Sequence, residues 1–315
     1  MIIMKYYLGI DVGGMSIKAG IVTADGKILF KTAEKVINGD AQKCLISAVD
    51  NTISFAKKEN LKISSAGIGL PCVFDKKSGV VAYGNNLDFK GLNVKDLFHE
   101  RYGLDITLAN DAAAAALGEY RFGAAKGYAN SVLITLGTGV GCGIILGGEI
   151  IESNSSAVGE FGQTVIVPDG RKCTCGKRGC FEAYCSMTAL KNDVYREMQK
   201  NKKSLLWQRI KPNEFDGRAF FDCIDKDETA ARIYSRFIKY LSLGVLNVAN
   251  FLRPDIILLG GAVSAQGDRL ILPIQKFLDE NLFAKEYTKV IPVKAAQNGN
   301  DAGILGAAAL CFKEK

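Results

Sequence analysis

The sequence contains a single histidine, His99, among its 315 residues. A serine or cysteine nucleophile activated in a triad requires a histidine beside it. His99 lies in an amphipathic segment far along the chain from the motifs described below, and we expect it on the surface of a helix. A histidine-based nucleophilic triad is therefore excluded.

The sequence also lacks a long apolar run. Glycines and charged residues interrupt every apolar stretch well before the length that a transmembrane helix needs. The start of the chain has no charged segment followed by an apolar one, as a secretory leader would have. We therefore expect a cytoplasmic protein without membrane partners, whose nine cysteines are reduced thiols.

A concentrated basic region is missing as well, although the net charge is +7. Lysines and arginines are scattered, and only residues 199–211 are locally basic, which a solvated face explains better than a nucleic-acid contact. The composition, 48% hydrophobic and 23% charged, is ordinary for a soluble enzyme. No segment is of low complexity, and the length indicates two domains or one large one.

Strands and helices alternate in the first part of the chain. Apolar patterning predicts strands at 6–10, 17–23, 27–31, 64–70 and 106–109. Asp25-Gly26 predicts a hairpin turn between the second and third of these strands. Helical spacing predicts helices at 42–58 and 92–102.

A second block repeats this pattern. Strands are predicted at 130–136, 143–146 and 149–151, followed by a long amphipathic helix at 229–252, a strand at 255–259 and a closing helix at 301–312. The chain therefore contains two α/β blocks, each with a glycine-rich turn between strands.

The two glycine turns are candidates for binding phosphate. Asp11-x-Gly13-Gly14 places a carboxylate at a strand end and backbone amides where phosphate oxygens could approach without a Cβ in the way. A hairpin that needs glycines only for steric reasons is an equally good explanation of this first turn. The second turn, Gly137-Thr138-Gly139, adds a hydroxyl to its backbone amides.

Asn110-Asp111 follows a predicted strand and begins an alanine-rich helical run. A carboxylate at a helix N-terminus is favoured by the helix dipole. Asp111 fits either an N-cap or a general base that takes the proton from an attacking hydroxyl. The two roles are compatible.

Three cysteines are spaced C-x-C-x4-C at Cys173, Cys175 and Cys180, a spacing that can close around one metal ion. Gln163 lies ten residues before the first of them, and Cys185 is the nearest further thiol. Either of these residues, or water, could complete a tetrahedral zinc site. A loop of three reduced thiols without a metal is the alternative.

The stretch from Gly159-Glu160-Phe161-Gly162 through the thiols to Glu182 resembles the signature of the ROK family, which contains sugar kinases and sugar-responsive repressors. The resemblance extends from Asp11 to residues 300–303 and includes Lys18 after the first turn and the segment 110–119. Two positions depart from the family pattern. Met15 stands where the family has Thr, and Gln163 stands where it has a His that ligates zinc and touches the sugar.

The resemblance implies an actin-like (ribonuclease-H-like) ATPase fold of class α/β, with two α/β domains around a cleft. We expect an N-terminal domain at 1–118, completed by a C-terminal helix at about 301–315, and a larger domain at 119–300 that carries the cysteine-rich loop. It also implies ATP, Mg²⁺ and a structural zinc as cofactors, and a homo-oligomer, a dimer or tetramer.

By the same resemblance, each matched residue has an expected role. Asp111 is the catalytic base. Sugar contacts are expected from Asn85, Asn86, Asn110, Asp111, Glu160, Gln163 and Glu182. ATP and Mg²⁺ contacts are expected from Asp11, Gly13, Gly14, Lys18, Gly137, Thr138, Gly139, Gly260 and Gly261. Zinc is expected on Cys173, Cys175 and Cys180, with weaker affinity because glutamine is a poorer zinc ligand than histidine.

The expected activity is transfer of phosphate from ATP to a hexose, with glucose at its 6-hydroxyl the first choice. Kinases for N-acetylmannosamine, allose, fructose or a β-glucoside remain alternatives, because pocket shape decides among them. A repressor of this family would carry an N-terminal DNA-binding extension, for which we expect no room before the strand at about residue 6. A sugar-binding protein without kinase activity is the remaining alternative, suggested by Met15 and Gln163.

Overall fold

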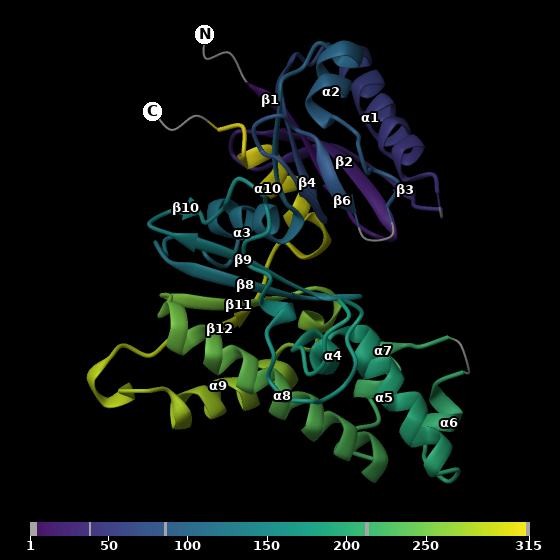
Figure 1. Ribbon diagram of the computed structural model, residues 1–315, viewed down its shortest axis with the longest axis vertical. Helices are drawn as coiled ribbons and strands as arrows, with labels where there is room; N and C mark the ends of the chain where they lie inside the picture. The colour runs from purple at the N-terminus through teal and green to yellow at the C-terminus, as the bar shows by residue number, and fades with distance from the viewer. Residues whose placement is uncertain (1–4, 38, 85–86, 212–213, 313–315) are drawn as a thin grey trace. The chain divides into compact units, whose positions relative to one another are not determined.

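The computed structural model describes residues 5–37, 39–84, 87–211 and 214–312 (Figure 1). Contacts divide the chain into two compact units. Unit 1 comprises Met1–Leu133, Gly143–Gly159 and Ala296–Lys315, and unit 2 comprises Ile134–Cys142 and Glu160–Ala295. The expected boundary after residue 118 falls inside the continuous helix α3 (Asp111–Phe122). Unit 1 instead continues to Leu133 and includes Gly143–Gly159.

Unit 1 is built on a five-stranded sheet in the order β3-β2-β1-β4-β7. Its strands are β1 (Tyr6–Val12), β2 (Ser16–Thr23), β3 (Ile28–Lys35), β4 (Ile63–Leu70) and β7 (Ile106–Asn110). The first three strands are antiparallel neighbours, whereas β4 runs parallel to both β1 and β7. The predicted turn between β2 and β3 is confirmed, with Gly26 in the left-handed region at φ +86°.

One face of this sheet packs against α1 (Ala41–Lys58) and α2 (Val94–Tyr102). Leu8 and Ile10 of β1 share a buried cluster with Leu45 of α1 and Phe98 of α2. Because side chains alternate across a strand, the residues between them face the other side. His99 of α2 is exposed, as expected.

The other face packs against the C-terminal helix α10 (Ala302–Ala309), where Tyr7 and Val22 meet Ile304 and Ala308. A Cβ at Gly9 of β1 would lie only 2.1 Å from the carbonyl oxygen of Ile304. Glycine therefore lets the α10 backbone lie directly on the strand. In Figure 1, α10 is the yellow helix beside β1 and β4.

A second five-stranded sheet has the order β10-β9-β8-β11-β12. Its strands are β8 (Ser131–Leu136), β9 (Val140–Leu146), β10 (Glu149–Ile150), β11 (Ile256–Gly260) and β12 (Val293–Ala295). A separate two-stranded sheet pairs β5 (Cys72–Phe74) with β6 (Val81–Gly84), and the sequence patterns did not predict it.

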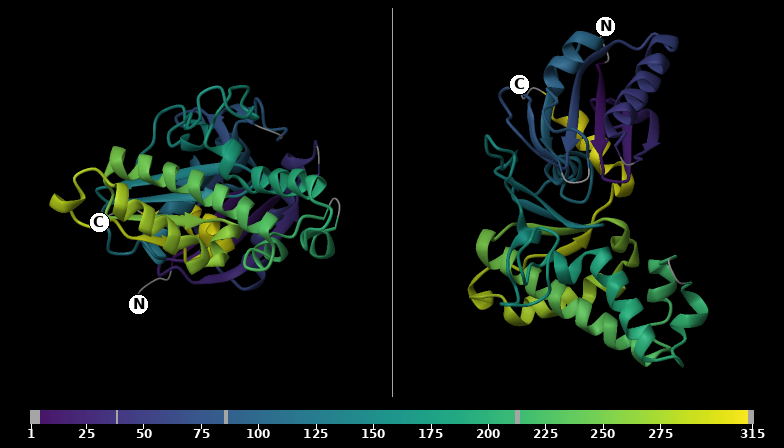
Figure 2. Two further views of the ribbon diagram at one scale, coloured as in Figure 1. Left: turned by 90° about the horizontal axis from the view of Figure 1, so that it is seen from below. Right: turned by 45° about the vertical axis from the view of Figure 1, so that its right-hand side comes forward.

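Unit 2 is rich in helices. They are α4 (Glu182–Cys185), α5 (Met187–Lys200), α6 (Leu206–Arg209), α7 (Gly217–Phe221), α8 (Glu228–Leu252) and α9 (Asp268–Asn281), with 3-10 turns η1 (Phe161–Gln163), η2 (Ala262–Gln266) and η3 (Lys285–Tyr287). A last 3-10 turn, η4 (Gly299–Asp301), precedes α10 in unit 1. The predicted long helix is α8, and the apolar residues along one side of it are buried. Helices α8 and α9 lie side by side (Figure 2).

No helix among the described residues is long and apolar enough to cross a membrane. All nine cysteines belong to the described part of the chain, and none of them forms a disulfide.

Candidate functional site

The first glycine turn joins β1 to β2 in unit 1. Asp11 and Lys18 lie directly opposite each other in this antiparallel pair, and the Lys18 ammonium donates to Asp11 Oδ2 at 2.9 Å. The same ammonium lies 3.3 Å from the carbonyl oxygen of Asn300, just before α10. The turn is closed by the Gly13 N–H, which donates to the carbonyl of Ser16 at 2.9 Å. The hairpin register therefore pairs the two charged residues of this motif.

The Asp11 carboxylate lies against the N-terminal turn of α10. A Cβ built on Gly303 would be 2.4 Å from Asp11 Cγ. A carboxylate near the N-terminus of a helix is stabilised by the helix dipole. Gly303 thus provides the space in which Asp11 is held.

Met15, at the tip of the first turn, is 72% exposed. Its main-chain carbonyl accepts a hydrogen bond from the Val36 N–H at 3.0 Å, so the turn backbone is tied to the segment after β3. The thioether offers no hydroxyl to a ligand. Ser16, the neighbouring hydroxyl, already belongs to β2.

The second glycine turn joins β8 to β9 in unit 2. The Gly137 N–H donates to the Gly139 carbonyl at 3.0 Å. The start of α5 fixes this turn from outside, because the Met187 N–H donates to the Gly137 carbonyl and the Thr188 hydroxyl donates to the Thr138 carbonyl, each at 2.8 Å. Thr138 itself is exposed.

Glu182, the first residue of α4, contacts this same turn. Its Oε2 accepts the Val140 N–H at 2.9 Å, and its Oε1 accepts the Thr174 hydroxyl at 3.1 Å. A Cβ on Gly139 would be 2.4 Å from Oε2. The structure therefore explains the glycine at 139 by the approach of a carboxylate from the same unit.

Gly260 ends β11, and Gly261 follows with φ +84°. A Cβ on Gly261 would lie 2.3 Å from the carbonyl oxygen of Leu136, and Leu136 is the residue that leads into the second turn. The two adjacent strands thus bring Gly261 beside the turn at 137–139.

Asn110 and Asp111 lie where β7 passes into α3. The Asn110 side chain caps the helix, since its Oδ1 accepts the N–H groups of Ala112 and Ala113 at 2.9 and 3.2 Å. The N-cap considered for Asp111 is therefore provided by its neighbour, and Asp111 is the first helical residue. Burial raises the pKa of Cys72, in β5, to about 12, and the negative charge of Asp111 adds to this effect.

Glu119 is a further residue of the segment 110–119, and we assigned it no role from the sequence. It is fully buried. Its carboxylate accepts the backbone N–H groups of Ala124, Gln297 and Asn298 at 2.9, 3.0 and 2.7 Å. Glu119 therefore ties α3 to the segment that leads into α10. A glutamate inside an alanine-rich helical run is the only sequence signal that could have suggested it.

The three thiols of the cysteine loop lie together, with their sulfurs within 4.8 Å of one another. The Sγ atoms of Cys175 and Cys180 are 3.6 Å apart, and Cys173 Sγ lies 3.4 Å from Gln163 Oε1. Ligands of a tetrahedral zinc at ordinary bond lengths are separated by roughly 3.5–3.8 Å. These two separations are close to those of zinc ligands, and three thiols with an amide oxygen are a donor set that could hold the ion. Cys185 is not part of the group and is buried at the end of α4.

Two carboxylates gather near this loop. Partial loss of hydration raises the pKa of Glu160, and the negative charge of Glu182 raises it further. Burial raises the pKa of Cys142 to about 12, with Glu160 adding to the effect. Unit 2 thus brings together Glu160, Gln163, Glu182, the thiols and the second turn. Asn85 and Asn86 lie outside the described residues.

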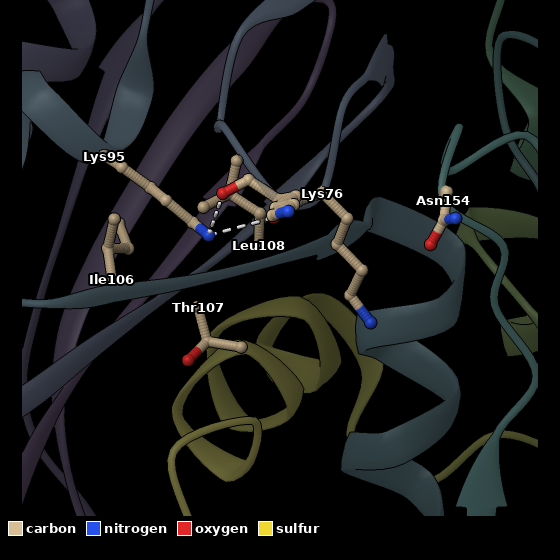
Figure 3. Close-up of a pocket in the computed structure, with 7 residues that line it drawn as sticks. Lys76, Lys95, Ile106, Thr107, Leu108 and Asn154 are labelled. Carbon is tan, nitrogen blue, oxygen red and sulfur yellow. Dashed lines mark hydrogen bonds between the residues drawn. The ribbon is translucent and has the colours of Figure 1, made fainter.

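A cavity of about 440 Å³ lies elsewhere in unit 1, beside the edge strand β7 (Figure 3). None of the predicted site residues that the structure describes lines this cavity. Lys95 Nζ donates there to the carbonyls of Lys76 and Lys77 at 2.9 and 3.0 Å, and Lys76 itself pairs with Glu152. Two of the three lysines that line the cavity thus have acceptors within the protein.

Comparison with known proteins identifies the family. The model of the ROK family matches residues 7–314. The chain is 32% identical to a glucokinase of Streptomyces coelicolor, over 98% of each chain. It is 31% identical to a glucokinase of Thermotoga maritima, over 98% of this chain and 97% of the other.

A solved structure shows the same fold. The crystal structure of a ROK family glucokinase from Streptomyces griseus, in complex with glucose and AMPPNP, superposes with a TM-score of 0.84 at 32% identity, covering 97% of this chain and 98% of that one. The expected α/β, actin-like ATPase fold is therefore confirmed. This protein belongs to the ROK family.

Proposed function

We propose that this protein is an ATP-dependent hexose kinase that phosphorylates glucose at its 6-hydroxyl. The observation that carries the proposal is the likeness to glucokinases along nearly the whole chain, at 31–32% identity. The glycine turns, the carboxylates and the helix start of α3 supply the chemistry that such a reaction needs.

In the proposed reaction, Asp111 accepts the proton of the attacking sugar hydroxyl. A general base must be held in position and must be charged. The Asn110 cap fixes the first turn of α3, and the N-terminal position of Asp111 favours its ionised form. Phosphoryl transfer depends mostly on such positioning and on neutralising charge.

We assign the nucleotide to the glycine turns. In unit 1, the backbone at Gly13 and Gly14, with the Asp11–Lys18 pair, faces the phosphates. In unit 2, the backbone at 137–139 and the Thr138 hydroxyl do so, and Gly260 and Gly261 border the adenosine. Mg²⁺ bound with ATP supplies positive charge that offsets the phosphates, and the Asp11 carboxylate is the residue of this chain that we assign to it.

We assign the sugar to Asn110, Asp111, Glu160, Gln163 and Glu182, together with Asn85 and Asn86. Carboxylates and amides offer the directional acceptors and donors that sugar hydroxyls require. Glu160 and Gln163 are close neighbours around η1, which supports a shared role.

We propose that Cys173, Cys175 and Cys180 bind zinc, with Gln163 Oε1 as the fourth ligand. The ion would hold the loop before α4 in shape, as structural zinc sites do. The three unpaired thiols in reach of one another support this assignment, and reduced cysteines agree with a place in the cytoplasm.

A homo-oligomer is part of the proposal. Phe251, Phe283, Tyr287 and Val290 are between 70% and 87% exposed. Phe251 lies near the end of α8, and the other three lie in the segment after α9. The two regions are in contact, because Asn250 Oδ1 accepts the Phe283 N–H at 3.2 Å. Large apolar side chains that are exposed together mark interaction surfaces. Light scattering should give at least a dimer, and Phe283→Glu should lower the mass.

The activity is tested by an ATP-coupled assay over glucose, N-acetylmannosamine, allose, fructose and a β-glucoside. We expect the highest kcat/KM with glucose. A higher value with another sugar would reassign the substrate. Sugar binding without turnover on any of them would show a sugar-binding protein that is not a kinase.

A further inference from the structure

We propose that Thr174 is a positioning residue that couples the thiol loop to the second glycine turn through Glu182. Thr174 lies between two of the thiols, and its hydroxyl donates to Glu182 Oε1 at 3.1 Å. The other oxygen of the same carboxylate accepts the Val140 N–H at 2.9 Å. One side chain therefore joins two segments that the proposed function assigns to zinc and to the nucleotide.

The carboxylate is confined from both sides. Glu182 Oε2 occupies the space that a side chain on Gly139 would fill, at 2.4 Å from the built Cβ. On the other side, the Cys173 thiol lies 3.8 Å from Oε1. Glu182 cannot rotate toward the thiol loop without leaving Val140, nor toward the turn without meeting Gly139.

The Thr174 hydroxyl restrains the orientation of the Glu182 carboxylate plane. A hydroxyl that donates to one oxygen fixes the plane of the carboxyl group and so directs the other oxygen at the Val140 N–H. An ionised carboxylate also has further lone pairs on each oxygen, so both contacts leave room for a ligand hydroxyl. The Thr174 hydroxyl therefore sets the orientation of the Glu182 carboxylate and the position of its two oxygens.

This arrangement has a consequence for the nucleotide. The Val140 N–H is the first donor after the turn at 137–139, whose carbonyls are already held by Met187 and Thr188. Releasing Glu182 removes the acceptor that holds the Val140 N–H on the β9 side of the turn. Thr174, an exposed residue of the cysteine loop, thus influences the affinity for ATP and ADP as well as for sugar. This inference rests on the proposed kinase function.

The test is Thr174→Val, which keeps the shape and removes the hydroxyl. We expect the dissociation constant for ADP, measured by calorimetry, to rise about 10-fold, the effect of losing one hydrogen bond to a charged group. Zinc content, measured on the same samples, should not change, because Thr174 offers no zinc ligand. Thr174→Ser should restore the parent affinity. Thr107→Val, on the exposed position of β7, is the matched control.

A double-mutant cycle locates the coupling. In a Glu182→Ala background, Thr174→Val should have no further effect on ADP binding, because the carboxylate that Thr174 contacts is already gone. The effects of substitutions at two contacting residues are then not additive. Full additivity, or unchanged ADP affinity in Thr174→Val, would overturn the proposal. A loss of zinc in Thr174→Val would also overturn it, since the loop itself would then have changed. Because ADP binding is measured directly, failure to find any phosphorylated hexose would count against the proposed function and leave this test intact.

Discussion

The carboxylate of Asp11 fills the space into which a side chain at Gly303 would project, since a Cβ there would lie 2.4 Å from Asp11 Cγ. The two residues come from opposite ends of the chain. The first strand and the last helix of unit 1 thus meet at a carboxylate that we assign to nucleotide and Mg²⁺.

Gly303→Ala should therefore displace Asp11. We expect weaker binding of Mg·ATP and a lower melting temperature, because the methyl group and the carboxylate cannot share one site. Asp11→Ala makes room for the methyl group, so adding Gly303→Ala to Asp11→Ala should cost little more. Parent-like nucleotide binding in Gly303→Ala alone would show that α10 can shift without consequence.

Asp111→Asn should lose on the order of 10²–10⁴ in kcat, the usual contribution of a general base. Sugar binding, followed by calorimetry, should persist because asparagine keeps the shape and most hydrogen bonds. Asp105→Asn, at an exposed position just before β7, serves as the control for charge removal. Turnover close to that of the parent would remove Asp111 from the proposed role.

Gln163→His should tighten zinc binding, because an imidazole nitrogen is a better zinc ligand than an amide oxygen. In a titration with a chelator, the variant should retain zinc at chelator concentrations that strip the parent. The readout is metal content and is independent of activity. Equal release from both proteins would place Gln163 outside the ligand set, and parent protein without zinc under reducing conditions would indicate a metal-free thiol loop.

Glu119→Gln should lower the free energy of unfolding by about 1–3 kcal/mol. The amide NH₂ of glutamine would replace one carboxylate oxygen, and a donor would then face a backbone N–H that needs an acceptor. The three N–H groups that the carboxylate accepts come from two separate segments. Chemical denaturation measures the change, with Glu100→Gln on the exposed face of α2 as control. Equal loss in both variants would mean that the carboxylate has no special role.

The raised pKa of Glu160 predicts a pH dependence of stability. The folded state keeps the proton at pH values where the unfolded chain has lost it, so the free energy of unfolding falls as pH rises from about 4.3 through the raised pKa. Glu160→Gln has no carboxyl group at this position, so its free energy of unfolding should not show this fall. The free energy of unfolding of the variant minus that of the parent should therefore increase over that pH interval. Denaturation curves from pH 4 to 8 test this, with the exposed Glu149→Gln as control. A constant difference between variant and parent would contradict the prediction.

Periodicity was sufficient to predict elements that have one buried side. The helix predicted at 42–58 is observed as α1, because Leu45, Val49 and Thr52 recur at helical spacing. Helix α9 was missed because Pro273 lies inside it, and proline ordinarily ends a helical pattern. The strands β5 and β6 are too short to carry a pattern.

Local motifs predicted where the candidate site lies, but not how it is held. The glycine turns could be found from the sequence, whereas the reason for Gly139 is a carboxylate more than forty residues away. Two of the three partners of Glu119, Gln297 and Asn298, are 178 and 179 residues distant along the chain. Such contacts follow from the tertiary fold, and a single sequence without periodic signal cannot reveal them.

The packing of α10 on β1 also constrains the order in which the polypeptide can fold during synthesis. Tyr7 and Val22, near the start, are covered by Ile304 and Ala308, near the end. Because the chain is made from its N-terminus, the face of β1 that carries Tyr7 stays uncovered while the residues between β1 and α10 are being synthesised. The nascent chain must therefore carry an exposed apolar face until α10 has been made, and α10 then covers that face of the sheet.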